Sequence, residues 1–229
     1  MQTIILLHGA LGAPNDLQAL SASLTSKGLR VHTPAFSGHA GTGFGAQFGI
    51  PGFSRELEIF MENSTPGGAH IFGYSMGGYV ALNLALKPGN RIQKIMTLAT
   101  KFNWSRETVE KETQGLNPEL MQQKIPAFAA MLEEKHGSTW KELVVKTADL
   151  MRELQELQLL DAASLKTISN KILIGIGDRD KMVSLEETVE AYKSLPGGSM
   201  YMLPATKHPL ETADPGLLSR LIEDFIARG

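Results

Sequence analysis

The stretch Gly73-Tyr74-Ser75-Met76-Gly77-Gly78 decides how the rest of the chain is interpreted. It follows a short apolar run, Ala69 to Phe72, and precedes an amphipathic run, Tyr79 to Leu86. This order predicts a strand, a sharp turn and a helix, with Ser75 at the apex of the turn. A turn this tight crowds the backbone, which glycine tolerates because it has no Cβ. The serine hydroxyl would sit at a helix N-terminus, where outward-pointing N–H groups favour negative charge.

The composition is that of an ordinary globular enzyme. The chain has 229 residues, of which 42% are hydrophobic and 20% charged, so one domain with a sizeable core is expected. A net charge of −2 without a basic stripe argues against nucleic acid as a partner. No apolar run approaches the length of a membrane span. The absence of cysteine excludes disulfides, thiolate nucleophiles and cysteine-ligated metal.

The first residues predict a strand and not a targeting segment. Met1 to Leu7 is too short, and lacks the basic start, for a signal peptide, and it runs directly into His8-Gly9. A cytoplasmic location is therefore expected.

Strands and helices alternate over most of the chain. Buried-strand patterns occur at 3–7, 29–33, 69–72, 92–98, 171–176 and 199–203. Helices are expected between them, including one over 54–63 that Ser54 would cap, after a glycine-rich loop at 35–52. Six strands alternating with helices predict a mostly parallel sheet with helices on both faces. In such a sheet the functional site lies beyond the carboxyl ends of the strands.

One segment departs from this alternation. From 102 to 166 one helical pattern follows another, which indicates a helical cap inserted into a core formed by 1–101 and 167–229. Asn117-Pro118 is a good helix start, and that helix should run to about Lys135. Thr139 and Glu142 have the spacing of a capping box before a helix that ends near Leu157.

Four motifs, each after a predicted strand, give the chain a resemblance to the α/β-hydrolase superfamily. They are His8-Gly9-Ala10, the G-x-S-x-G turn around Ser75, Gly177-Asp178-Arg179-Asp180, and His208 after the last strand. The pattern is similar to the small serine esterases of the MenH/BioH-like branch. The chain begins on the strand that is usually third in that family. The resemblance therefore implies a sheet of about six strands, with the first two family strands absent and the 29–33 strand at one edge.

The resemblance implies a catalytic triad in the order Ser75, Asp180, His208. A serine hydroxyl needs a base within hydrogen-bond reach, and His208 would first take its proton and later protonate the leaving group. The family pattern G-x-x-D-x-x-V fits Gly177, Asp180 and Val183, so Asp180 is preferred as the acid. Asp178 remains the alternative and would otherwise be a turn former that hydrogen-bonds its own backbone.

An oxyanion hole needs two donors aimed at the developing negative charge. The backbone N–H of Met76 is expected as one donor and that of Ala10 as the other, with Leu11 as the alternative to Ala10. Phe44, Trp104 and Met182 are candidates for lining an apolar substrate pocket, although ordinary core packing explains any one of them equally well.

The remaining histidines are assigned structural roles. His32 and His70 flank strands, His8 would brace the oxyanion turn, and His39 would order the glycine-rich loop. His136 ends a helix of the cap and is expected to face solvent. No metal site is predicted, because no histidine pair has ligand spacing, and no cofactor is expected.

The leading functional hypothesis is a serine hydrolase that cleaves small-molecule carboxylic esters through an acyl-serine intermediate. Thioester hydrolysis, lactone opening and a MenH-like elimination would use the same three residues. A ligand-binding protein on a hydrolase scaffold is the alternative from a different class. The sequence does not decide the oligomeric state.

Overall fold

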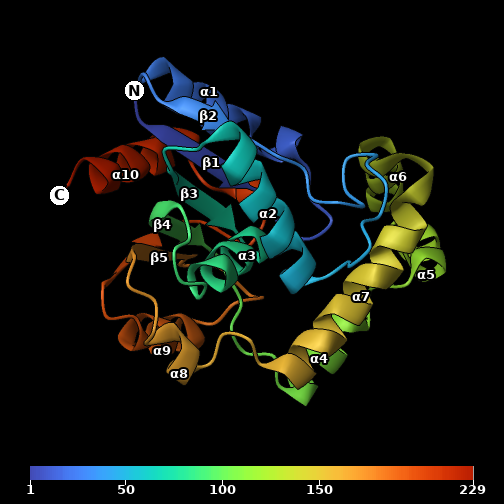
Figure 1. Ribbon diagram of the computed structural model, residues 1–229. Helices are drawn as coiled ribbons and strands as arrows, with labels where there is room; N and C mark the ends of the chain where they lie inside the picture. Colours follow the sequence, from blue (N-terminus) through green and yellow to red (C-terminus); the bar gives the residue numbers. More distant parts are fainter. Residues whose placement is uncertain (229) are drawn as a thin grey trace.

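The computed structural model describes residues 1–228 and centres on one six-stranded sheet (Figure 1). The strand order is β2-β1-β3-β4-β5-β6, and every neighbouring pair is parallel. The strands are β1 (Thr3–Leu7), β2 (Arg30–His32), β3 (Ala69–Tyr74), β4 (Ile92–Leu98), β5 (Lys171–Gly177) and β6 (Gly198–Leu203). The predicted sheet of six strands is confirmed, and β2 forms one of its edges as expected.

Helices connect these strands. They are α1 (Gln18–Ser26), α2 (Ile50–Ser64), α3 (Met76–Ala85), α4 (Arg106–Thr113), α5 (Pro118–Lys124), α6 (Pro126–His136), α7 (Trp140–Leu157), α8 (Ala162–Leu165), α9 (Leu185–Ser194) and α10 (Pro215–Ala227). Short 3-10 helices occur at Pro14–Leu17, Gly137–Thr139 and Leu210–Thr212.

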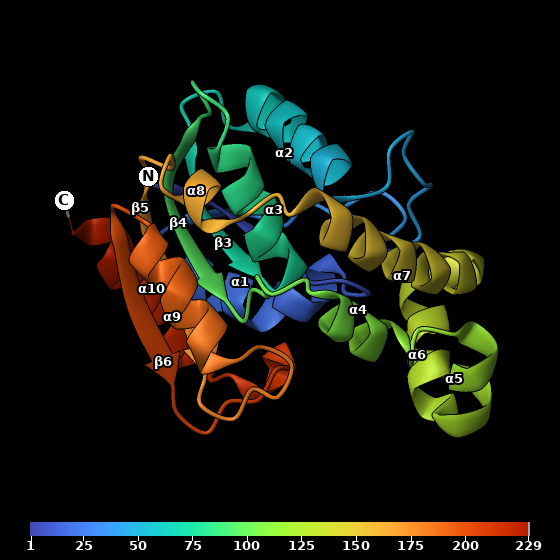
Figure 2. The same ribbon diagram turned by 90° about the horizontal axis from the view of Figure 1, so that it is seen from below.

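Side chains that alternate along β1 divide the hydrophobic core into two layers. Ile4 and Leu6 pack into a cluster with residues of α1 and α10, whereas Ile5 and Leu7 belong to a larger cluster with residues of α2 and α3. Figures 1 and 2 show these helix pairs on opposite faces of the sheet. All four side chains are at most 1% exposed, as expected for a parallel strand covered on both faces.

The chain between β4 and β5 contains α4 to α8, and in Figure 2 α4 to α7 extend to one side of the sheet. Part of this segment has its own small cluster around Leu132 and Trp140, against which Leu11 of the β1–α1 loop packs. Val109 of α4, together with Leu150 and Leu154 of α7, belongs instead to the core beside α2 and α3. The segment 102–166 is thus anchored to the sheet layers at one end and packs on itself at the other.

Two predicted helix boundaries and one predicted cap need correction. Helix α2 begins at Ile50 and not at Ser54, whose hydroxyl donates to Val80 O (3.3 Å) inside the core. Helix α7 begins after Thr139 and ends at Leu157 as expected, but Thr139 makes no capping bond, and its hydroxyl donates to His136 O (3.2 Å) instead. The helix expected from Pro118 to about Lys135 is two helices, because Pro126 cannot donate a helical hydrogen bond.

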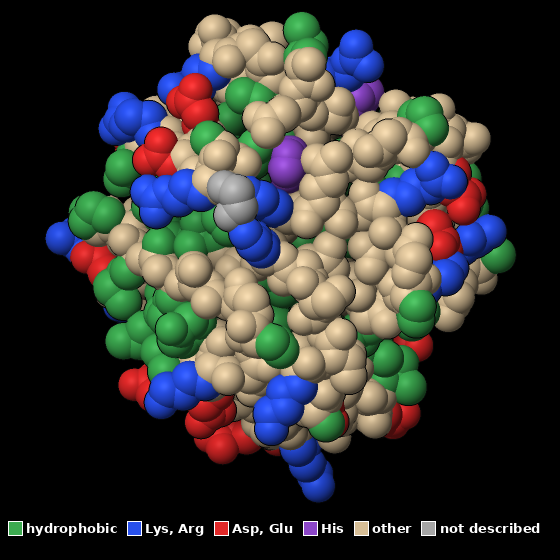
Figure 3. Space-filling view, turned by 60° about the vertical axis from the view of Figure 1, so that its left-hand side comes forward, with side chains coloured by type: hydrophobic (Ala, Val, Ile, Leu, Met, Phe, Trp, Pro, Cys, Tyr) green, Lys and Arg blue, Asp and Glu red, His purple; other side chains and the backbone are tan. Residues whose placement is uncertain are grey.

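Within residues 1–228, no helix has the length and apolarity needed to cross a bilayer. On the face shown in Figure 3, Lys and Arg side chains are interspersed with Asp and Glu.

Candidate active site

Ser75 occupies a strained turn between β3 and α3. Its φ is 51° and its ψ is −117°, a conformation that is rare for a residue with a side chain. Two hydrogen bonds hold the turn on the neighbouring strand: Ser75 N–H donates to Leu98 O (2.8 Å), and the Thr100 hydroxyl donates to Ser75 O (3.1 Å). The end of β4 therefore supports the strained residue.

The glycines of the turn are required by close backbone contacts. A Cβ on Gly73 would lie 2.4 Å from the backbone of Gly78, and a Cβ on Gly77 would lie 2.5 Å from Leu7 O. A Cβ on Gly78 would lie 2.0 Å from the Thr100 hydroxyl oxygen. These distances are shorter than real Cβ contacts, which explains the glycine pattern read from the sequence.

Ser75, His208 and Asp180 meet at the carboxyl edge of the sheet. Ser75 Oγ lies 3.4 Å from His208 Nε2, and His208 Nδ1 lies 2.9 Å from Asp180 Oδ2. A carboxylate only accepts hydrogen bonds, so the proton of the neutral imidazole is on Nδ1 and Nε2 is free to accept from the serine. The serine–histidine distance lies at the long end of the hydrogen-bond range.

The Asp180 carboxylate accepts three hydrogen bonds. Its Oδ1 accepts from Met182 N–H (2.8 Å) and Val183 N–H (2.9 Å), while Oδ2 accepts from His208. Burial acts to raise the pKa of Asp180, but the hydrogen bond from His208 and the two backbone donors outweigh it, so this pKa lies below its usual range. Asp180 therefore stays ionised and holds the imidazole in one tautomer.

Asp178 fastens the loop after β5 to the loop that carries His208. Its Oδ1 accepts from Thr206 N–H (3.0 Å), and Arg179 N–H donates to Thr206 O (2.9 Å). Gly177 permits this approach, because a Cβ there would lie 2.3 Å from Thr206 O. The expectation that Asp178 bonds its own backbone is thus corrected: it bridges two loops.

Tyr74 holds the histidine from the other side. Its hydroxyl donates to His208 O (2.9 Å), and its ring centroid lies 5.7 Å from that of the imidazole. Burial raises the pKa of Tyr74, so the hydroxyl remains a donor at neutral pH. Neither Tyr74 nor Thr100 was predicted to have a role. The signal that could have identified them is a polar side chain at the end of β3 and another just after the end of β4.

Two backbone N–H groups near Ser75 remain without a partner. Within residues 1–228, neither Ala10 N–H nor Met76 N–H donates a hydrogen bond, and both residues line the cavity beside Ser75. Gly9 allows the β1–α1 loop to come close, since a Cβ there would lie 3.3 Å from Ser75 Cβ. These donors can therefore face an oxygen bound above the serine.

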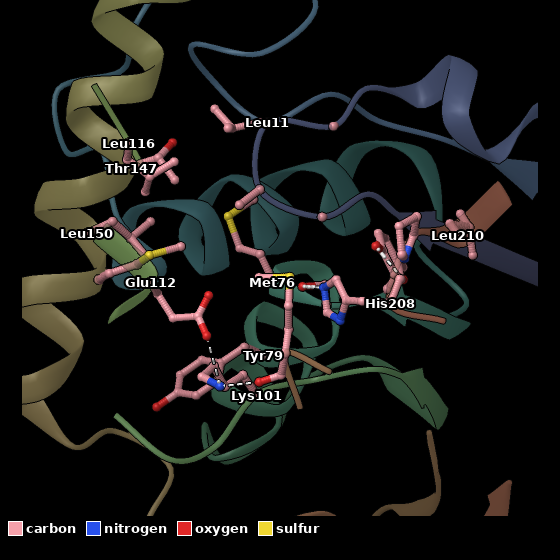
Figure 4. A pocket seen from close by; sticks show the side chains of 18 of the residues that line it. Leu11, Met76, Tyr79, Lys101, Glu112, Leu116, Thr147, Leu150, His208 and Leu210 are labelled. Carbon is pink, nitrogen blue, oxygen red and sulfur yellow. Dashed lines mark hydrogen bonds and ion pairs between the residues drawn. The ribbon is translucent and has the colours of Figure 1, made fainter. Parts of the chain in front are cut away.

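The serine and the histidine open into a cavity of about 600 Å³ between the sheet edge and the helices α4 to α7 (Figure 4). Its wall is mainly apolar and includes Trp104 and Met182, two of the residues expected there. Phe44 does not line it, which corrects the third expectation. Its ring contacts Phe48 (5.6 Å between centroids), and the Lys146 ammonium lies 5.2 Å above it.

Two ion pairs line the same cavity. Lys135 donates to both oxygens of Asp16 (2.7 and 2.9 Å), and Asp16 also accepts from Ala13 N–H. Lys101 Nζ lies 3.5 Å from Glu112 Oε1. These charged residues were not predicted as part of the site, because nothing in their sequence spacing indicates that they meet.

His136 is buried, contrary to the expectation that it faces solvent. It is 1% exposed, its Nδ1 accepts from Ala40 N–H (3.0 Å), and its Nε2–H donates to Leu11 O (3.0 Å). Burial lowers its pKa, so the neutral form is favoured. This residue joins α6 to both the glycine-rich loop and the β1–α1 loop.

His8 and His39 lie next to it as neutral rings. His8 Nδ1–H donates to Gly9 O (2.8 Å), and His39 Nδ1–H donates to Ser37 O (3.1 Å). The ring of His39 lies 4.8 Å from that of His8 and 5.9 Å from that of His136. Burial lowers the pKa of His8 to about 4 and that of His39 to about 3. Within the described residues, no group of three His, Asp or Glu side chains is arranged to hold a metal ion.

Comparison with known proteins connects this geometry to a family. A family model described as alpha/beta hydrolase fold matches residues 2–136. Two curated relatives are pimeloyl-[acyl-carrier protein] methyl ester esterases. The one from Aromatoleum aromaticum is 34% identical over 100 residues, which cover 42% of this chain and 36% of the relative. The one from Aliivibrio fischeri (strain ATCC 700601 / ES114) is 28% identical over 120 residues, which cover 52% and 44%.

The chain thus spans less than half the length of these two relatives. Among solved structures, NosK from Streptomyces actuosus superposes with a TM-score of 0.84 at 22% identity, covering 98% of this chain and 96% of that one. The family model spans more than half of the sequence, and the structural likeness extends over nearly all of it. The chain therefore belongs to the α/β-hydrolase fold family.

Proposed function

We propose that the protein is a serine hydrolase that cleaves carboxylic esters of small to medium size through an acyl-serine intermediate. The observation that carries the proposal is the hydrogen-bonded series from Ser75 through His208 to Asp180, with distances of 3.4 and 2.9 Å. A hydroxyl, a base in the correct tautomer and a buried carboxylate are the parts that activate a serine nucleophile.

The reaction would begin as His208 Nε2 takes the proton of Ser75 and the serine oxygen attacks the ester carbonyl. The backbone N–H groups of Ala10 and Met76 would hold the resulting oxyanion. His208 would then protonate the departing alcohol, and water activated by the same imidazole would release the acid. Asp180 keeps the imidazole oriented and stabilises its charged form throughout.

The cavity supports a substrate with an apolar portion. It measures about 600 Å³ and has a mainly apolar wall, which suits an acyl chain of moderate length. We propose that residues 102–166 act as a cap over this cavity, since α4, α5, α6 and α7 all contribute lining residues. The names of the two curated relatives, which refer to a methyl ester of an acyl chain, agree with an ester bond as the target.

A fluorophosphonate probe tests the nucleophile directly. Wild-type protein should be labelled and Ser75→Ala should not, because the probe reacts only with an activated serine. Ser194→Ala, which removes a partly exposed hydroxyl at the end of α9, is the matched control and should be labelled like wild type. A wild-type protein that resists the probe would rule out the activated serine. A panel of esters, thioesters and lactones would then rank the bonds that are cleaved.

A further inference from the structure

The pair Lys101 and Glu112 distinguishes one region of the cavity. Figure 4 shows both side chains toward α4 and Tyr79, away from His208 and Leu210. Lys101 is 12% exposed and Glu112 is 10% exposed, so the charges are largely removed from bulk water. Burying a charged group is costly unless it is paired and hydrogen-bonded. The hydrogen-bond partners of Lys101 and of Glu112 therefore show which of the two could still bind a group of a ligand.

The ammonium of Lys101 is well surrounded by acceptors. It donates to Met182 O, and it lies 3.5 Å from Glu112 Oε1 and 4.0 Å from Glu187 Oε1. Glu187 is itself satisfied, because its carboxylate accepts from Asn103 N–H (2.8 Å) and Ser184 N–H (2.8 Å). Lys101 thus has three acceptor groups around it, as many as its ammonium has N–H donors.

Glu112 is the unsatisfied member. Within residues 1–228 it makes no hydrogen bond, and its one polar partner is Lys101 at 3.5 Å. A carboxylate has about four lone-pair positions, and those of Glu112 that do not face Lys101 have no protein partner among the described residues. Figure 4 shows one oxygen of Glu112 directed at Lys101 and the other toward the open cavity.

The local charge indicates what Glu112 would accept. Glu112 and Glu187 place two carboxylates beside one ammonium, so these three side chains together have a net charge of −1, and Glu112 is the carboxylate of the two that lines the cavity. Asp16 and Lys135, by contrast, neutralise each other through two hydrogen bonds. A negative, under-bonded group in an apolar cavity complements a hydrogen-bond donor and disfavours an anion.

We propose that Glu112, positioned by Lys101, is a subsite for a hydrogen-bond donor, a hydroxyl or ammonium group, on the substrate portion remote from the scissile carbonyl. This inference rests on the proposed function for the position of the carbonyl, which would lie at Ser75. Lys101 is the residue after Thr100, in the segment that follows β4, and the Thr100 hydroxyl donates to Ser75 O. This short segment therefore connects the position of Ser75 to that of the subsite. The protein would then prefer esters whose chain ends in a donor to those of equal length that end in a methyl group.

The test is a series of methyl esters of increasing chain length whose far end is methyl, hydroxyl, ammonium or carboxylate. For wild type, kcat/KM at the best chain length should be about tenfold higher for the hydroxyl and ammonium ends than for the methyl end. The carboxylate end should be the poorest. Glu112→Gln keeps the shape and one acceptor but removes the charge, so the ammonium preference should disappear while part of the hydroxyl preference remains.

Glu107→Gln is the matched control, since it removes the same charge from an exposed position on α4. It should retain the wild-type preferences. Thermal unfolding and probe labelling of Glu112→Gln verify that the variant is folded and that its serine is active.

Binding to Ser75→Ala separates this inference from the proposed function, because dissociation constants of the same esters can be measured there without turnover. Tighter binding of donor-ended esters, lost on adding Glu112→Gln, supports the subsite even if wild type hydrolyses none of them. Equal binding of methyl-ended and donor-ended esters would overturn the subsite, even if wild type hydrolyses them all. Tightest binding of the carboxylate-ended ester would overturn it as well.

Discussion

At the scale of single residues, Asp178 and Asp180 show how two carboxylates two positions apart acquire different tasks. Asp180 contacts the imidazole of His208 at 2.9 Å, whereas Asp178 accepts from Thr206 N–H at 3.0 Å and contacts no side chain of the triad we propose. The carboxylate three residues after the end of β5, that of Asp180, therefore contacts His208, and the carboxylate directly after the strand, that of Asp178, contacts the loop at Thr206.

Asparagine substitutions should separate these tasks. We expect Asp180→Asn to lower kcat by about 10³- to 10⁴-fold, because the amide no longer fixes the imidazole tautomer. Asp178→Asn keeps an acceptor oxygen for Thr206 and should lower kcat less than about tenfold. Steady-state kinetics on one ester, with circular dichroism to check folding, makes the comparison. If the Asp178 variant is the inactive one, the assignment of the acid is wrong.

The buried histidines should make stability depend on pH. Burial lowers the pKa of His39 from 6.5 to about 3 and that of His8 to about 4, so the unfolded chain binds more protons than the folded one below about pH 6.5. Their contribution is complete above that pH and is lost as the pH falls. As the pH falls from about 6.5 to 4, each of these two histidines should lower the free energy of unfolding by about 1.4 kcal/mol per pH unit.

His39→Asn isolates one of these contributions. Asparagine can still donate to Ser37 O but does not titrate, so the stability of the variant should fall less steeply with decreasing pH than that of wild type. Urea unfolding at pH 5, 6, 7 and 8 would measure both slopes. Equal slopes would show that His39 can be protonated without unfolding the protein.

At the scale of elements, the end of α6 is attached to the β1–α1 loop by two contacts of different quality. His136 is buried and uses both ring nitrogens, on Ala40 N–H and Leu11 O. The neighbouring pair of Lys135 and Asp16 is partly exposed to water. Leu11 follows Ala10, so this attachment also positions a backbone donor that we propose for the oxyanion.

We expect His136→Ala to lower the free energy of unfolding by about 3 kcal/mol, because it leaves a cavity and two unpaired backbone groups. It should also lower kcat, since the loop after β1 loses its support. Lys135→Ala, on the same helix, should cost less than about 1 kcal/mol because exposed ion pairs contribute little. Chemical unfolding and ester kinetics measure both effects. Equal costs for the two variants would mean that the buried ring is not what holds the loop.

Elements whose signal is local could be predicted from the sequence, and those decided by tertiary contacts could not. Short apolar or alternating runs located every strand, and glycines located the Ser75 turn, because both patterns are carried by neighbouring residues in the sequence. The cap of α2 was misplaced since Ser54 bonds Val80 across the core and not its own helix. His136 was misjudged because its burial depends on loops about 100 residues away in sequence. The charges of Lys101 and Glu112 meet only through the fold.

At the scale of the whole molecule, the hydrophobic clusters are unequal. The two clusters on the faces of the sheet are large, whereas the one formed by α5, α6 and α7 has five buried members. Local opening follows the amount of buried apolar contact, so the three clusters should not open together.

Hydrogen exchange should reveal this difference. Amides of α5 and α6 should exchange well before those of β1, β3, β4 and β5, because the small cluster can open while the sheet remains intact. Exchange measured by mass spectrometry on peptides of 118–136 and 69–98 gives the comparison. Indistinguishable rates would show that the molecule opens as a single unit, and a cap that moves independently would then be excluded.

The order of the strands has a consequence for the protein during its synthesis. The first four strands, which carry Ser75, leave the ribosome before the residues of β5 and β6 exist, and His208 is made 133 positions after the serine. At about 5–20 residues per second, a nascent chain spends roughly 7–27 s between translating these two codons. During that interval His208, the base that we propose for Ser75, does not yet exist, so we expect a growing chain to leave esters in its surroundings intact.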